Sequence, residues 1–142
     1  MAKVLTIDTK LGEAKNQDQT DPLMLTTVTG IEGISQPFAY DVSLARHPSK
    51  GDVVPQDLIG TMARIGIQQT NSSIFFYRTG MIQNFQKAGV YTGADGRGAA
   101  STNLLTYRAR IVPAFQMLAQ ETRFRIFAQQ DAVSIIQSIL RK

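Results

Sequence analysis

The sequence predicts a mainly β domain whose antiparallel strands close as a barrel or pack as a sandwich. Three observations support this fold class. Several segments alternate polar and apolar residues, which is the period of a strand with one covered face. These segments recur roughly every 10 to 15 residues and are separated by turn-forming residues. Helical periodicity is confined to short turns and to the end of the chain, which argues against alternating strand and helix units.

The first half of the chain is expected to contribute three strands. Residues 3–9 alternate, and residues 23–32 are rich in β-branched side chains, with Gly30 as an expected bulge. Residues 38–44 place aromatic and aliphatic side chains on one side and small or polar ones on the other. The polar residues 11–22 are predicted to form a turn and a loop.

The middle of the chain is expected to contribute two longer strands. Residues 47–55 are predicted to be a loop, and residues 55–60 (PQDLIG) a single helical turn closed by glycine. Strands should follow at 61–69 and 73–91. Because the second is too long for one flat strand, we expect it to bend or break at Gly80 and Gly89. Residues 93–101 are typical of a flexible hairpin tip.

Residues 104–142 carry the most specific pattern in the chain. Residues 107–112 alternate arginines with apolar neighbours, and Pro113 ends this strand because proline lacks the N–H that a ladder needs. We expect a helical turn at 113–120, a second alternating strand at 123–127 and an amphipathic helix capped by Asp131. This helix should pack on the barrel. The predicted buried cluster consists of Phe38, Tyr40, Ile111, Ile126, Ile135 and Ile139.

Length and composition indicate a globular domain, here taken as one domain spanning residues 1–142. The chain has 142 residues, of which 43% are hydrophobic, and no cysteine. Its apolar runs are far shorter than the roughly 20 residues that span a bilayer. The first residues lack the apolar core of a signal peptide, so we expect synthesis in the cytoplasm and no membrane insertion.

The sequence offers no catalytic, cofactor or metal-binding constellation. Its single histidine, His47, lies beside a proline in a polar loop, and neither HExxH nor GxSxG is present. The glycines at 93, 96 and 98 lack the Lys-Ser/Thr pair of a phosphate-binding loop. We therefore expect a non-enzymatic protein without a cofactor or a bound metal.

The positive charge of the chain is concentrated at its end. Of the fifteen basic residues, six lie in 107–142, against two acidic residues there. Arg108 and Arg110, like Arg123 and Arg125, are two residues apart, so each pair should project from one side of a strand. Such a segment is a nucleic-acid footprint in some proteins and more often a solvated or subunit-contacting face. These four arginines are our candidate interface residues.

Aromatic residues raise an alternative binding hypothesis. The run Phe75, Phe76, Tyr77 with Arg78, and Phe124 and Phe127 beside the later arginines, would suit a stacking surface like that of an OB-fold. Since neighbours on a strand face opposite sides, core packing accounts for at least half of these residues. We therefore expect no specific nucleic-acid binding.

Taken in order, these segments carry a family resemblance. The positions are PFAYDV at 37–42, DLIG at 57–60, FYRTGMIQNF at 76–85, Tyr107-Arg108, Pro113, Leu118, RIF at 125–127, Ile135-Ile136 and Ile139-Leu140. This set, from about residue 23 to the end, resembles the amino-terminal domain of VgrG proteins. These are the spike proteins of type VI secretion and are related in fold to phage tail baseplate hub proteins. The chain departs from the family at Ala114 and Gln116, where tryptophan is frequent, and at Thr79, where histidine is frequent.

The resemblance implies a barrel-like hub domain with a structural role at the base of the secretion spike. In that family three copies form a ring on a hexameric tube, so the implied partners are further copies of the full-length chain, the tube protein, and spike tip and effector proteins. The resemblance also implies export with the spike. Because the family's chains are several times longer, we expect an amino-terminal fragment that is monomeric or weakly associated alone. The alternatives are a phage tail baseplate hub protein, an OB-like nucleic-acid-binding barrel and a small-molecule-binding barrel.

Overall fold

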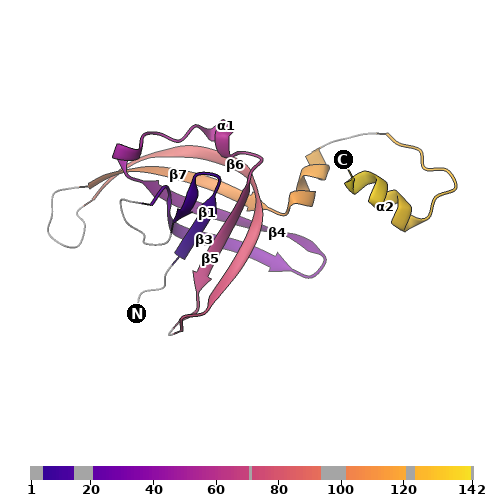
Figure 1. Cartoon of the computed structure of the whole chain (residues 1–142), viewed down its shortest axis with the longest axis horizontal. Coiled ribbons are helices and arrows are strands. Elements are labelled where there is room, and N and C mark those ends of the chain that lie inside the picture. The colour runs from indigo at the N-terminus through magenta and orange to yellow at the C-terminus, as the bar shows by residue number, and fades with distance from the viewer. Residues whose placement is uncertain (1–4, 15–20, 71, 94–101, 121–123, 142) are drawn as a thin grey trace.

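The computed structural model describes residues 5–14, 21–70, 72–93, 102–120 and 124–141. Seven strands form one antiparallel sheet in the order β2-β1-β5-β6-β7-β4-β3 (Figure 1). The strands are β1 (Leu5–Thr9), β2 (Gly12–Ala14), β3 (Met24–Gly33), β4 (Gln36–Arg46), β5 (Met62–Gln68), β6 (Phe75–Gly93) and β7 (Thr102–Val112). The helical elements are η1 (Pro48–Lys50), α1 (Pro55–Leu58), η2 (Ala114–Gln120) and α2 (Ala132–Leu140). The predicted fold class, mainly β and antiparallel with short helical turns and a C-terminal helix, is confirmed.

The sheet curls into a barrel that is not closed. Its outermost strands are β2 and β3, and no ladder joins them among the described residues. Cα atoms of β1 and β3 come within 8 Å of each other, yet these strands do not pair. Strand β2 has only three residues, and all three pair with β1. The curvature of a barrel is therefore present, and its closure is not.

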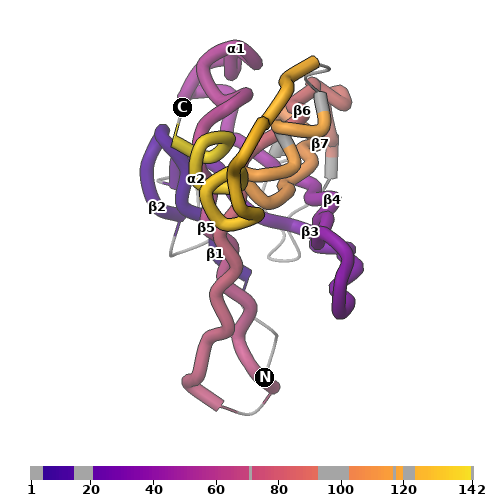
Figure 2. The backbone as a smooth tube through the Cα atoms, turned by 90° about the vertical axis from the view of Figure 1, so that its right-hand side faces the viewer, coloured from indigo at the N-terminus to yellow at the C-terminus, as the bar shows by residue number. Residues whose placement is uncertain are grey.

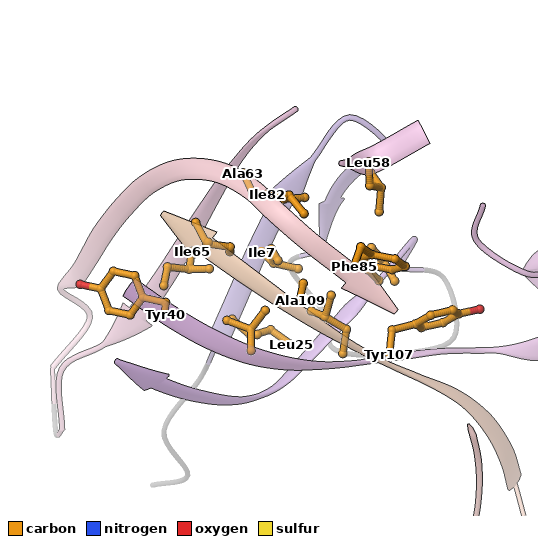
Figure 3. Packing of buried hydrophobic residues seen from close by; sticks show 14 of the residues in the cluster. Ile7, Leu25, Tyr40, Leu58, Ala63, Ile65, Ile82, Phe85, Tyr107 and Ala109 are labelled. Atoms are coloured by element: carbon orange, nitrogen blue, oxygen red, sulfur yellow. The ribbon is translucent and has the colours of Figure 1, made fainter. Parts of the chain in front are cut away.

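The hydrophobic core lies inside the curl of the sheet, where inward side chains of the strands meet (Figure 3). In β4, Tyr40 and Val42 are buried while Asp41 between them is exposed, as the alternation predicts. Phe85 and Tyr107 come from the neighbouring strands β6 and β7 and stack with ring centroids 5.2 Å apart. Burying one large apolar side chain contributes roughly 1.5 to 3 kcal/mol. This cluster is therefore the main source of stability of the fold.

Strand β6 is one continuous, strongly bent strand of nineteen residues that changes partner midway. Up to Met81 it pairs with β5, and from Met81 onward it pairs with β7. The second shift in register falls at Gly89, as predicted, but the first lies after Ile82 and not at Gly80. Gly80 is buried against the backbone of β7, where a Cβ would come within 2.6 Å of the Val112 carbonyl oxygen. The glycine there permits close strand contact and does not break the strand.

The expected loop at 11–22 begins with a short strand. Residues 12–14 form β2, which pairs with β1 through Ile7 and Ala14. The hairpin forms because Gly12 adopts a φ of 122°, which side-chain-bearing residues rarely adopt. Residues 15–20 of that segment lie outside the described residues.

Gly30 is not the bulge that the sequence predicts. In the β3–β4 ladder, register shifts fall between Leu25 and Thr27 and again after Ile31. Gly30 pairs directly with Tyr40, and a Cβ at this position would overlap the Tyr40 ring. The absence of a side chain therefore serves packing of the aromatic ring across the two strands.

Asp52 fastens the segment before α1 onto the end of the barrel. Its carboxylate accepts hydrogen bonds from the Tyr107 hydroxyl at 2.5 Å and from the Lys87 ammonium, and the Val53 N–H donates to the Tyr107 hydroxyl at 3.2 Å. The hydrogen bonds from Lys87 and then Tyr107 hold the pKa of Asp52 below its ordinary value. Burial, and then the bond to Asp52, raises the pKa of Tyr107.

Glu32 links the β3–β4 and β5–β6 hairpins at a level of the sheet beyond the end of β7. The Arg78 guanidinium donates to the Glu32 carboxylate at 2.5 and 3.2 Å, and the Tyr40 hydroxyl donates to it as well. Arg78 lowers the pKa of Glu32, and Glu32 raises that of Arg78. Figure 2 shows the β3–β4 and β5–β6 hairpins extending from the body. The Glu32–Arg78 pair therefore joins the tip of the β3–β4 hairpin to the middle of the β5–β6 hairpin.

The C-terminal segment differs from its prediction in two respects. Although η2 and α2 form where expected, and Asp131 caps α2 by accepting from the Ser134 N–H at 2.7 Å, residues 124–127 form no strand. Ile126 is 96% exposed. The local alternation is present there, but none of the described strands lies beside it to form a ladder. The prediction of a strand at 123–127 is therefore wrong for its described part, and Arg123 lies outside the described residues.

Helix α2 does not pack on the barrel, contrary to prediction. It contains no buried residue, and Figure 1 shows it apart from the sheet. Ile135 and Ile139 are only half-buried, and Ile136 is exposed. Of the predicted cluster, Tyr40 and Ile111 are in the core and Phe38 packs against it. The amphipathic pattern is intact, and its apolar stripe is left uncovered by the described part of the chain.

Candidate interaction surface

Arg108 and Arg110 project from the outer face of β7, as their spacing predicts. Both are exposed, and the residues that alternate with them, Tyr107, Ala109 and Ile111, are buried in the core. Their Cα atoms are about 6.8 Å apart, the repeat of two residues in a strand. The sequence therefore placed this arginine pair on the correct face.

Strand register surrounds the two arginines with polar side chains. On one level across the sheet, the partners run Thr27 on β3, Ser43 on β4, Arg108 on β7 and Gln86 on β6. On the next level, they run Thr29, Asp41, Arg110 and Asn84. Neighbouring strands lie about 4.8 Å apart, so each level is a row of four adjacent polar groups.

These eight residues line a surface hollow of about 470 Å³, which we call the polar hollow. Val42 and Ala109 line it only between the two rows. A cavity of a few hundred Å³ has room for several side chains of a partner, and hydroxyl, amide and guanidinium groups supply both donors and acceptors.

The polar hollow carries a net positive charge. The one carboxylate among its described lining residues, on Asp41, lies 3.8 Å from the Arg110 guanidinium, and both side chains are at least half exposed. An exposed pair at this distance is weak, on the order of 0 to 1 kcal/mol. Arg108 has no ion-pair or hydrogen-bond partner among the described residues. One cation is therefore uncompensated, and the other is loosely held.

A second, smaller hollow adjoins the first. It has a volume of about 280 Å³, shares Arg110 with the polar hollow and reaches Gln116 of η2. Arg110 therefore stands between the two hollows. The polar surface continues from the middle of the sheet to the start of the C-terminal segment.

Of the other two candidate arginines, Arg125 does not line this surface. Arg125 is exposed and lies in the segment between η2 and α2, not on a strand. Arg123 lies outside the described residues. The prediction that Arg123 and Arg125 project from one side of a strand depended on a strand that does not form in its described part, residues 124–127.

The aromatic residues behind the nucleic-acid hypothesis are dispersed in the structure. Phe75 and Tyr77 stack on one side of β6 with centroids 5.9 Å apart, and Arg64 lies 5.1 Å over the Tyr77 ring. Arg78, however, is held by Glu32. Within the described residues, no ring contact joins Phe124 to this group. Among the described residues, the predicted stacking surface is thus reduced to the Phe75 and Tyr77 rings on the β5–β6 hairpin.

The single histidine of the chain caps a short helical turn. His47 accepts a hydrogen bond from the Ser49 N–H at 3.3 Å and so caps η1. No group of three or more His, Asp or Glu side chains in the described ranges is placed to hold a metal ion. None of the helices described here is long and apolar enough to span a bilayer.

Sequence reasoning missed the partners of the arginine pair. Asp41 and Ser43 fall on the solvent side of the predicted strand 38–44, so the signal for their exposure was present. That they lie beside β7, more than sixty positions later in the chain, follows only from the β4–β7 register. The sequence did not predict the exposure of Asn84 and Gln86, because the register shift after Ile82 decides which face of β6 they occupy.

The fold defines the class of protein as an open antiparallel β-barrel domain. The family model described as phage tail baseplate hub (GPD) matches residues 31–142, which include β4 to α2 and both hollow-lining arginines. The chain therefore belongs to the phage tail baseplate hub family. No curated protein matches it at a significant level.

Proposed function

We propose that this protein is a non-enzymatic component of a contractile injection machine and forms the base of a type VI secretion spike. The observation that supports this most is the baseplate hub family match over residues 31–142. That match covers the same ordered segments that resemble the amino-terminal domain of VgrG. A baseplate hub is a structural role, and the spike base is its counterpart in secretion.

Uncovered apolar surface supports a role in assembly. Val133, Ile136 and Leu140 of α2 are each more than half exposed, and Phe115 of η2 is also exposed. Exposed apolar patches rimmed by polar groups commonly mark contact sites with other proteins. We propose that α2, together with Arg108, Arg110, Arg123 and Arg125, meets another domain or subunit.

The proposed assembly is a trimer in which three copies form a ring on a hexameric tube and carry spike tip and effector proteins. Linking the chains through a spike would raise the local concentration of each base domain for its neighbours. The protein would be made in the cytoplasm, assembled into the apparatus and exported with the spike.

Tagged protein in its native host tests the proposal. Sheath and tube particles purified from these cells should contain the protein at one end of the tube by electron microscopy. It should also reach the medium in normal cells and stay inside cells whose sheath is deleted. Absence from the particles would contradict a hub role altogether. Presence in phage particles, with release that does not depend on a secretion sheath, would favour the phage tail hub alternative.

A further inference from the structure

We propose that the polar hollow is a docking site for an extended acidic segment of a partner protein, with carboxylates that pair with Arg108 and Arg110. This inference rests on the proposed role as a subunit of a larger assembly. It adds the chemistry of the partner and the residues that select it.

The net positive charge of the hollow favours binding of an anion. Arg108 has no partner among the described residues, and Arg110 has only the Asp41 carboxylate at 3.8 Å. A guanidinium binds a carboxylate through two parallel hydrogen bonds, a geometry that lysine does not offer. An incoming carboxylate therefore supplies Arg108 with its missing counterion and gives Arg110 a better one than Asp41.

The spacing of the hollow favours an extended segment. Arg108 and Arg110 are two residues apart on β7, about 6.8 Å. In an extended partner, side chains at positions i and i+2 point the same way and repeat at the same distance. Hydroxyls of Thr27 and Ser43 and the amide of Gln86 lie in the row of Arg108, where they are placed to bond the partner's backbone.

The surroundings favour a protein over a nucleic acid. None of the described residues that line the hollow is aromatic, so they offer no face on which a base would stack. Arg108 and Arg110 are the only cations among its described lining residues, and Asp41 would repel a continuous chain of phosphates. A polypeptide with carboxylates on one side and polar or small residues elsewhere meets both conditions.

A binding titration with synthetic peptides tests this proposal on the chain itself. The probe is a fluorescent peptide of alternating Ser and Glu, and its controls are the same peptide with Gln for Glu and a peptide of equal composition with its glutamates in adjacent pairs. We expect binding of the alternating peptide to weaken as salt rises, and each control to bind at least tenfold more weakly. Arg108→Ala should lower affinity for the alternating peptide at least tenfold.

Arg64→Ala is the matched control because Arg64 is an exposed arginine on β5 of the same sheet, outside the hollow. Its affinity should change less than twofold. Thermal melts verify that both variants fold. As a second test, Arg108→Glu with Arg110→Glu should abolish binding of the acidic peptide and create binding of a peptide with Lys for Glu.

Two results would overturn the proposal. One is that the alternating peptide fails to bind, or that Arg64→Ala and Arg108→Ala lower its affinity equally. The other is single-stranded oligothymidine that binds more tightly than the peptide and depends on Arg108. These outcomes are separable from failure of the proposed function. A protein that is found in contractile particles but ignores the peptide loses only the docking site, whereas peptide binding by a protein absent from such particles leaves the site and removes the hub role.

Discussion

Replacing Tyr107 with Phe removes the hydroxyl that joins the core of the barrel to the segment before α1. The ring of Tyr107 is buried and its stacking on Phe85 should survive the change. What is lost is a donor to the Asp52 carboxylate at 2.5 Å and an acceptor for the Val53 N–H at 3.2 Å. The variant therefore isolates one polar contact.

The magnitude follows from what the lost groups can do instead. A hydrogen bond to a charged group contributes roughly 1.5 to 3 kcal/mol. Part of this returns, because Asp52 is about half exposed and can bind water, and the Val53 N–H retains the Asp52 carboxylate at 3.1 Å. We expect Tyr107→Phe to lower the free energy of unfolding by about 1 to 2 kcal/mol.

Urea unfolding followed by circular dichroism measures this difference, provided that the transition is two-state. Tyr91→Phe is the control, because Tyr91 is an exposed tyrosine on the same sheet. Its free energy of unfolding should stay within about 0.5 kcal/mol of the natural protein. If Tyr107→Phe cost no more than Tyr91→Phe, the hydroxyl would not fasten the segment, and our account of this end of the barrel would be wrong.

Further expectations concern the core, the helix, acid and association. Ile65→Ala should lower the free energy of unfolding by about 2 to 5 kcal/mol because Ile65 is fully buried. The control, Ile34→Ala at a hairpin tip, should change the free energy of unfolding by less than about 0.5 kcal/mol. Equal effects of the two variants in urea titrations would contradict the assigned core. Ile135→Ala should also stay within about 0.5 kcal/mol, since α2 has no buried residue; a larger loss would show that α2 packs on the barrel in solution. Because the pKa of Asp52 is lowered in the folded protein, the unfolded chain binds more protons. The stability that Asp52 contributes is therefore present above about pH 3.9 and is lost as pH falls through the lower folded pKa. Thermal melts from pH 6 to 2 should show a smaller loss of stability in acid for Asp52→Asn than for the natural protein, and an equal loss would refute the contribution of Asp52. Sedimentation of this chain at tens of micromolar should show a monomer or weak association, and a tight trimer would contradict this expectation.

Local chemistry explains why the sequence predicts the elements of this fold well. Three features act within a few residues and can therefore be predicted from a short stretch of sequence. They are the alternation of side chains across a strand, the end of the ladder at Pro113 and the capping of α2 by Asp131. The arginine pair on β7 belongs to this category, because Arg108 and Arg110 share a face in any strand that contains them. The family resemblance likewise depends on the order of such local segments.

Tertiary structure alone decides which strands become neighbours and which patterns are used. Residues 124–127 alternate as well as many strands do, but a strand needs a partner to bond its backbone, and no other described segment pairs with them. Helix α2 has the periodicity of a packed helix, yet periodicity does not specify what covers its stripe. The polar hollow exists because β4 and β6 flank β7 in a register that brings Asp41 and Asn84 beside Arg110. Pairing energies between segments distant in sequence set that register, and no short stretch of the chain contains them.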